Sequence, residues 1–258
     1  MITIKSKREI ELMQEACKIT ALTYDYIEKI IKPGMSTLEL DHLAEKFIKE
    51  HGGIPAQKGY PSGVRGVPSF PGTLCVSVND VVIHGIPSKD IIIKDGDVVS
   101  VDLVVLKNGY HGDAARTFLV GKCSKEAQEL VAVTKQAFFE GLKMAKPGNR
   151  IGDISNAVET YVRSFGFNLV REFQGHGIGK AMHEEPGVPN IGKAGRGPRL
   201  EPGMTICIEP MVMAGRQDIW ELDDGWTIAT QDGSLSAHYE NTILITEGEP
   251  KVLTLLEK

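Results

Sequence analysis

The chain of 258 residues carries 29 Lys and Arg against 34 Asp and Glu, and this net charge of −5 argues against a strong nucleic-acid binder or a polybasic membrane anchor. A composition of 41% hydrophobic and 24% charged residues is typical of a folded protein rather than a disordered one. The four cysteines form no Cys-x-x-Cys pair, so we expect neither a disulfide framework nor a structural zinc site. Residues 1–8 contain no apolar signal core, and no apolar stretch is long enough for a membrane span. We therefore expect a cytoplasmic protein.

Four helices are predicted along the chain. The first begins after Ser6, because Ser6 and Glu9 fit a capping box and apolar residues follow at spacings of three and four until Pro33-Gly34. The second begins after Ser36 and ends at Gly52-Gly53. The other two are expected over residues 125–145 and 154–165.

The remaining segments read as strands and glycine-rich loops. Residues 54–72 are rich in Pro and Gly and are expected to form a long loop, which in a compact domain is often functional. Turn signals separate the apolar runs. We predict strands over residues 74–84 with a hairpin turn at Asn79-Asp80, and over 98–106 and 110–120 with a hairpin at Asn108-Gly109. A last hairpin at Asp232-Gly233 precedes a strand over 234–246.

Two segments of the first half recur in the second. The segment 32–40, with its Lys-Pro-Gly, resembles 146–154 at an offset of 114 residues. A Gly followed by an apolar run that ends in a carboxylate occurs at 96–102 and again at 203–209, at an offset of 107 residues. We infer two α/β halves related by internal duplication, with Asp102 and Glu209 at matching places.

Carboxylates interrupt several apolar strands. Asp102 lies within an apolar run, where an unpaired carboxylate is costly. If Asn108-Gly109 forms a two-residue turn, Val104 pairs with Asp113, and Asp102 and Asp113 are diagonal neighbours on one face of the sheet. A slightly different turn would place these two aspartates directly opposite each other. The alternative is a half-solvated sheet face with two ordinary aspartates.

Glu209 and Glu240 repeat the pattern in two later apolar strands. Four such carboxylates indicate a multivalent cation, often two metal ions about 3.5–4 Å apart. His84, His176 and His183 each lie beside Gly or Pro, and the glycines around His176 leave room for a ligand to approach the backbone. A single His is more often a structural residue than a functional one, but three such histidines together favour a functional role.

Other familiar motifs are excluded by spacing. His183-Glu184-Glu185 lacks the second His of the helical zinc-protease motif, and Pro186 would break the helix. Residues 175–180 fit neither the dinucleotide fingerprint nor the phosphate-binding loop. Cys75 and Cys207 lack a nucleophile motif and are interpreted as buried thiols.

At this point the sequence resembles the type I methionine aminopeptidases along almost its whole length. The resemblance rests on Val82–Pro87, Ser100–Asp102, His111–Asp113, Gly175–Gly179 with His183–Pro186, Thr205–Pro210, and Trp226 with Ser236–Glu240. It implies an α+β pita-bread (creatinase/aminopeptidase) fold with two pseudo-symmetric α/β halves around a dinuclear metal site. The chain is then one catalytic domain, 1–258, with halves of about 1–122 and 123–258.

By this resemblance, the two divalent metal ions have five ligands. These ligands are Asp102, Asp113, His176, Glu209 and Glu240. Asp113 and Glu240 would bridge the ions, Asp102 would complete one site, and the other two residues would complete the second. An oxygen-rich set suits Mn²⁺ or Fe²⁺, while Co²⁺, Zn²⁺ and Ni²⁺ remain open.

The resemblance also implies a metallo-exopeptidase mechanism. A water between the metal ions would lose its proton to Glu209 and attack the first peptide carbonyl. His183 would stabilise the oxyanion, and His84 would contact the scissile nitrogen. The expected activity is removal of the N-terminal methionine from nascent proteins and peptides, favoured by a small second residue.

The methionine pocket is expected to be small and apolar. The resemblance places Tyr60, Phe70, Cys75, Met182 and Trp226 on its lining. Two features depart from the better-known pattern: residues 61–69 carry about six extra residues, and Met182 replaces a common aromatic. The insertion reads equally as a functional loop or as a tolerated surface insertion.

Three other functions are disfavoured, because the capped helix at Ser6 begins the catalytic domain directly, the short path from Glu185 to Glu209 leaves no room for an insertion, and all five ligands are present. A prolidase or creatinase-like enzyme would usually carry a large preceding domain, and a type II methionine aminopeptidase would carry a helical insertion between residues 185 and 209. A catalytically inactive peptide-binding module would be expected to lose ligands. An N-terminal ribosome-docking extension is absent, so any ribosome contact is expected to be transient or made by the catalytic domain, and a monomer is expected.

Overall fold

The computed structural model describes residues 1–256, and the four predicted helices are present. They are α1 (Lys7–Ile30), α2 (Thr37–Glu50), α3 (Lys125–Met144) and α4 (Ile151–Ser164). The predicted capping box at Ser6 and Glu9 is confirmed, and the Ser36 side chain caps α2. Helix α4 begins three residues earlier than expected, because the Asp153 carboxylate accepts a hydrogen bond from the Arg150 amide at 2.7 Å.

A nine-stranded antiparallel sheet within the described residues forms the centre of the molecule. Its main order is β1-β4-β5-β14-β9-β7-β8, with β2 pairing with β4 and β15 pairing with β14. The bounds of these strands are β1 Ile54–Pro55, β2 Cys75–Val78, β4 Val98–Lys107, β5 Tyr110–Leu119, β7 Gln174–Gly177, β8 Glu184–Pro189, β9 Thr205–Ile208, β14 Glu240–Leu244 and β15 Lys251–Val252.

Two three-stranded sheets flank this centre. One has the order β13-β10-β6 and the other β11-β12-β3. Their bounds are β3 Val81–Ile83, β6 Asn168–Leu169, β10 Met211–Met213, β11 Ile219–Glu221, β12 Ile228–Thr230 and β13 Ser236–His238. No helix among the described residues is both long and apolar enough to span a bilayer.

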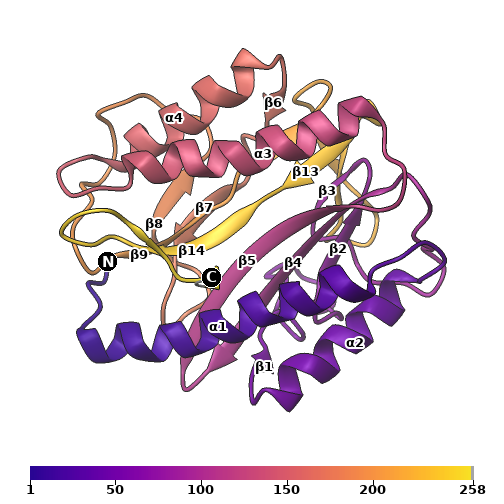
Figure 1. Ribbon diagram of the computed structural model, residues 1–258, viewed down its shortest axis with the longest axis horizontal. Helices are drawn as coiled ribbons and strands as arrows, with labels where there is room; N and C mark the ends of the chain where they lie inside the picture. The colour runs from indigo at the N-terminus through magenta and orange to yellow at the C-terminus, as the bar shows by residue number, and fades with distance from the viewer. Residues whose placement is uncertain (257–258) are drawn as a thin grey trace.

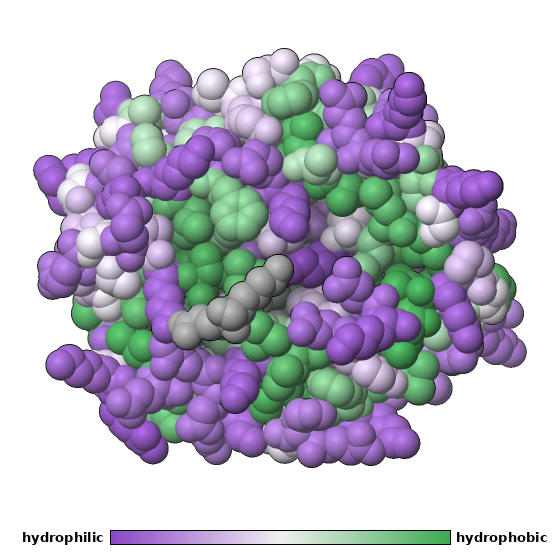
Figure 2. Space-filling model, viewed as in Figure 1, coloured by the Kyte–Doolittle hydropathy of each residue, from purple (hydrophilic) through white to green (hydrophobic). Residues whose placement is uncertain are grey.

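The helices cover the sheet in two pairs, with α1 and α2 along one half and α3 and α4 along the other (Figure 1). Each pair has its own core: Ile27, Leu40 and Val101 belong to one, and Phe138 and Ile206 to the other. Hydrophilic residues cover much of the face shown in Figure 2, with hydrophobic residues visible between them. The helix-covered face of the central sheet therefore packs against two separate hydrophobic cores, one under each helix pair.

The inferred duplication has a structural counterpart in the backbone. Gly34 and Gly148, at the equivalent Lys-Pro-Gly turns, have φ values of 89° and 90°. Gly96 and Gly203, before the two apolar runs, have φ values of 93° and 90°. Equivalent residues thus adopt the same left-handed conformation, which favours Gly. The central order β4-β5-β14-β9 joins the two halves at the β5–β14 pair.

Two predicted hairpins are wrong and one is right. The turn at Asn108-Gly109 joins β4 and β5 as expected, with φ of 51° and 80° and with Val104 paired to Asp113. At Asn79-Asp80 and at Asp232-Gly233 the chain turns, but the flanking strands join different sheets. The expected single strand 234–246 is likewise divided at Tyr239 into β13 and β14. Local turn signals do not specify which partner a strand chooses.

Candidate active site

Every residue singled out for the site lines one cavity of about 520 Å³. These residues are Tyr60, Phe70, Cys75, His84, Asp102, Asp113, His176, Met182, His183, Glu209, Trp226 and Glu240. They come from both halves of the chain and from the loops between strands. The cavity also has lining residues that the sequence interpretation missed, namely Gln57, Ile83, Phe173 and His238.

The carboxylates lie on adjacent central strands because of the register. Ala115 on β5 pairs with Asp102 on one side and with Glu240 on the other. Strand side chains alternate, so Asp113, two residues from Ala115, shares this face. Val101 and Leu103 pack in the helix-covered core, so Asp102 projects to the opposite face. The two aspartates are therefore diagonal neighbours, and the small Ala115 side chain lies between the two outer carboxylates.

Burial and mutual repulsion make this cluster unfavourable as four free anions. Burial raises the pKa of Asp102 to about 7. Burial, followed by Glu240 and Asp102, raises the pKa of Asp113 well above its usual range. The pKa values of Glu209 and Glu240 are raised for the same two reasons, burial first and neighbouring carboxylates second.

Several carboxylate oxygens have no hydrogen-bond partner among the described residues: Asp102 Oδ1, Asp113 Oδ1 and Glu240 Oε1. Within the described chain, no Lys or Arg side chain lines the cavity to neutralise them. Buried polar atoms without partners call for an ion or water. The donor set therefore fits divalent cations.

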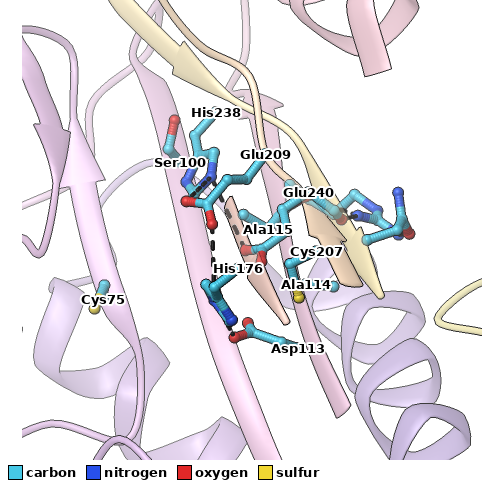
Figure 3. Close-up of polar contacts among 12 residues, drawn as sticks. Cys75, Ser100, Asp113, Ala114, Ala115, His176, Cys207, Glu209, His238 and Glu240 are labelled. Atoms are coloured by element: carbon cyan, nitrogen blue, oxygen red, sulfur yellow. Dashed lines mark hydrogen bonds and ion pairs between the residues drawn. The ribbon is translucent and has the colours of Figure 1, made fainter. Parts of the chain in front are cut away.

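His176 faces these carboxylates from β7 (Figure 3). Its Nε2 lies 3.7 Å from Asp113 Oδ2 and 3.7 Å from Glu209 Oε1. Its Nδ1 donates to the Gly177 carbonyl at 2.9 Å, so the lone pair is on Nε2 and points toward the carboxylates. Burial lowers the pKa of His176 to about 4, which keeps the imidazole neutral at pH 7.

The glycines beside His176 lie against neighbouring strands. A Cβ on Gly175 would lie 2.3 Å from the Cys207 carbonyl oxygen, and one on Gly177 would lie 2.3 Å from that of Glu185. Strands β8 and β9 therefore occupy the space beside these glycines, while Gly175 still lines the cavity. The glycines let three strands pack closely and so fix the position of His176.

His183 and Tyr60 form a polar pair at the cavity mouth. The Tyr60 hydroxyl lies 2.8 Å from His183 Nδ1, and the His183 ring lies edge-on to that of His176 at 4.4 Å. Burial, followed by His111, lowers the pKa of His183. The imidazole is therefore neutral at pH 7, with Nδ1 engaged by the phenol.

Aromatic side chains surround His84 and form the apolar part of the cavity. The His84 ring lies edge-on to Phe173 at 5.7 Å and to Trp226 at 6.2 Å. Burial, followed by His183, lowers the pKa of His84 to about 4. Phe70 packs edge-on against Trp226 at 5.2 Å. Both thiols interpreted as buried, Cys75 and Cys207, are buried and free.

The loop at 61–69 contacts this apolar part. The Trp226 indole Nε1 donates to the Pro68 carbonyl at 2.9 Å. Val67 packs against Gly225, where an added Cβ would lie 2.8 Å from Val67 Cγ2. The loop is therefore attached to the segment that carries Trp226.

Comparison with known proteins assigns this arrangement to a family. Residues 11–247 match the model of metallopeptidase family M24. The methionine aminopeptidase of Clostridium acetobutylicum is 51% identical over 257 residues, which cover 100% of both chains. The chain belongs to the methionine aminopeptidases of metallopeptidase family M24. The resemblance inferred from the sequence motifs is confirmed, and divalent metal use follows from the family.

Solved M24 structures confirm the pita-bread fold. The methionine aminopeptidase of Thermotoga maritima matches with a TM-score of 0.95 at 42% identity, covering 99% of this chain and 100% of that one. The prolidase of Pyrococcus furiosus matches with a TM-score of 0.78 at 25% identity, covering 99% of this chain and only 66% of that one. The likeness to the aminopeptidase is greater in identity, in fold and in coverage, which disfavours the prolidase alternative.

Proposed function

We propose that this chain removes the N-terminal methionine from peptides and nascent proteins, using two divalent metal ions bound in the cavity. One observation carries the proposal: three carboxylates on strands, Glu209 directly after β9, and His176 line one cavity, with three carboxylate oxygens unpartnered among the described residues. Asp113 and Glu240 are central to the cluster and would bridge the ions. Asp102 would complete one site, and His176 with Glu209 the other. The oxygen-rich set favours Mn²⁺ or Fe²⁺ and also accepts Co²⁺, Zn²⁺ or Ni²⁺.

Metal ions bound here would lower the pKa of a water molecule and polarise a carbonyl group. Glu209 accepts the proton of the attacking water. Its side chain is 12% exposed and faces the cavity, so this carboxylate reaches both the cluster and the substrate. A general base needs this direct access to the proton that it removes.

His183 donates a hydrogen bond to the developing oxyanion. This role requires the tautomer in which His183 Nδ1 accepts from the Tyr60 hydroxyl, 2.8 Å away, and the ring proton is on Nε2. His84, neutral and enclosed by Phe173 and Trp226, contacts the scissile nitrogen and assists its departure. Glu209 thus acts as the general base, and His84 and His183 act as hydrogen-bonding groups on the substrate.

The apolar part of the cavity selects methionine. Phe70, Cys75, Met182 and Trp226, with Tyr60 at the edge, surround a space that fits an unbranched thioether side chain. Full burial of such a side chain contributes about 1.5–3 kcal/mol. The free α-amine of the substrate would face the carboxylate cluster, which restricts cleavage to the chain terminus.

The cellular context is also part of the proposal. We infer a cytoplasmic monomer that acts on new chains through transient ribosome contact made by the catalytic domain. The net charge of −5 supports contact that does not rely on extensive binding to RNA.

A peptide panel tests the proposed activity. Chelator-stripped protein would receive Mn²⁺, Fe²⁺, Co²⁺ or Zn²⁺ separately, and then Met-Ala-Ser, Met-Lys-Ser, Ala-Pro-Ser or N-formylated Met-Ala-Ser. Mass spectrometry would detect the free amino acid. We expect metal-dependent release of Met from Met-Ala-Ser and little release from the other three peptides. Cleavage of Ala-Pro-Ser instead would indicate a proline-directed enzyme. The absence of release with every metal would favour a peptide-binding module.

A further inference from the structure

His238 ends β13, two residues before Glu240, and its side chain lies beside the carboxylate cluster (Figure 3). Its Nε2 is 3.8 Å from Glu209 Oε2 and 4.0 Å from Glu240 Oε2. The residue is 2% exposed, and Nε2 has no hydrogen-bond partner in the described part of the chain. A buried imidazole nitrogen thus faces two carboxylate oxygens at a distance too long for hydrogen bonds.

The backbone holds His238 in this position. The Thr117 hydroxyl donates to the His238 carbonyl at 2.8 Å and accepts from the His238 amide at 2.9 Å. Thr117 has one hydroxyl proton, so the Ser100 hydroxyl, 2.8 Å away, is the donor in the bond between these two side chains. Strands β4 and β5, which carry Asp102 and Asp113, therefore also fix the position of His238.

The same spacing occurs at His176. Its Nε2 lies 3.7 Å from two carboxylate oxygens, close to the 3.8 and 4.0 Å found at His238. Two nitrogen or oxygen donors that each lie about 2.1 Å from one divalent ion are about 3.0–4.2 Å apart, depending on the angle between them. Glu209, His238 and Glu240 each offer one donor atom within 4.8 Å of the others. His238 therefore meets the geometric requirement that His176 meets.

We propose that His238 is a sixth protein donor of the metal centre, binding through Nε2 on the side of Glu209 and Glu240. This inference rests on the proposed function, because it requires the metal ions of that site. A second imidazole changes the ligand set from four carboxylates and one imidazole to four carboxylates and two imidazoles. Imidazole suits Zn²⁺, Fe²⁺ and Co²⁺ better than it suits Mn²⁺. His238 thus shifts the metal preference of this chain toward the borderline ions.

Counting bound imidazoles tests the proposal. Chelator-stripped protein would receive substoichiometric Cu²⁺, and pulsed EPR would count the coordinated imidazoles from their remote nitrogens. We expect two in the wild type, one in His238→Gln and one in His176→Gln. His42→Gln, a matched change at an exposed position on α2, should retain two. Thermal unfolding would verify that each variant is folded.

Calorimetry gives a second readout that is independent of activity. His238→Gln should weaken Zn²⁺ binding by about tenfold or more and Mn²⁺ binding by less. A count of one imidazole in both the wild type and His238→Gln would overturn the proposal. This holds even if His238→Gln weakens Zn²⁺ binding, because His238 would then act only by positioning Glu209. If His176→Gln also leaves the imidazole count and the metal stoichiometry unchanged, the proposed metal site itself fails.

Discussion

Replacing Asp102 with Asn should stabilise the metal-free protein and destabilise the metal-loaded one. Burial raises the pKa of Asp102 from its ordinary value of 3.8 to about 7. At about 1.4 kcal/mol per pH unit, keeping this carboxylate ionised at pH 8 costs the folded protein about 4 kcal/mol. Asn removes the charge but still buries a polar group, so we expect a gain of about 2–4 kcal/mol. For a chain of this length, that corresponds to roughly 5–15 °C in melting temperature.

The sign of the pH dependence follows from the same shift. The folded state binds this proton more tightly than the unfolded chain does, so the destabilisation is present above pH 7 and is lost as the pH falls from about 7 toward 4. The Asp102 carboxyl should therefore contribute a gain in the stability of the metal-free wild type as the pH falls from 8 to 5, measured relative to Asp102→Asn so that the opposing histidine contributions cancel.

Denaturant unfolding with chelator present, at pH 5, 6, 7 and 8, measures both effects. Asp90→Asn, at an exposed position, is the matched control and should change neither the stability nor its pH dependence. With Mn²⁺ at a thousandfold excess over the wild-type Kd the order should reverse, because the wild type gains about 4.1 kcal/mol from each of its two ions and the variant loses most of the gain from the ion that Asp102 holds. A metal-free Asp102→Asn protein less stable than the wild type at pH 8 would refute the view that this carboxylate is unfavourable without a cation.

Three further predictions address the rest of the site. Tyr60→Phe removes the hydroxyl that contacts His183 Nδ1, so kcat should fall about tenfold with an unchanged metal stoichiometry, and an unchanged kcat would refute this role. Trp226→Phe keeps an aromatic ring but loses the hydrogen bond to the Pro68 carbonyl. KM for Met-Ala-Ser should therefore rise about two- to tenfold with little change in kcat. A loss of metal affinity as large as the rise in KM would contradict this role in the pocket. Gly177→Ala forces a Cβ to within 2.3 Å of the Glu185 carbonyl, so the free energy of unfolding should fall by about 2–5 kcal/mol, whereas Gly248→Ala, in open space, should be near neutral.

Local signals in the sequence predicted the elements that carry the site. The Asn108-Gly109 turn determines the β4–β5 register, and alternation along these strands then places Asp102 and Asp113 on one face. Serine caps likewise placed the starts of α1 and α2. Periodicity and turn chemistry are properties of a few adjacent residues, which is why they can be read without the fold.

Strand partners were not predictable in the same way. The Asp232-Gly233 turn looks like a hairpin, yet β12 and β13 join different sheets, because the pairing depends on strands distant in sequence. His238 was missed for the same reason. It lies within the Ser236–Glu240 motif, but its proximity to Glu209 arises from strand packing and from the Thr117 hydroxyl, which the motif alone does not reveal. The extra loop at 61–69 was ambiguous until the Trp226–Pro68 bond connected it to the cavity.

The central claim is that five residues hold two metal ions in one cavity. Anomalous diffraction from crystals of Mn²⁺-loaded protein, measured on both sides of the manganese edge, tests it most directly. The account predicts two anomalous peaks per chain, one among Asp102, Asp113 and Glu240, and the other among Asp113, His176, Glu209 and Glu240. A single peak, or peaks that lie away from these side chains, would contradict it.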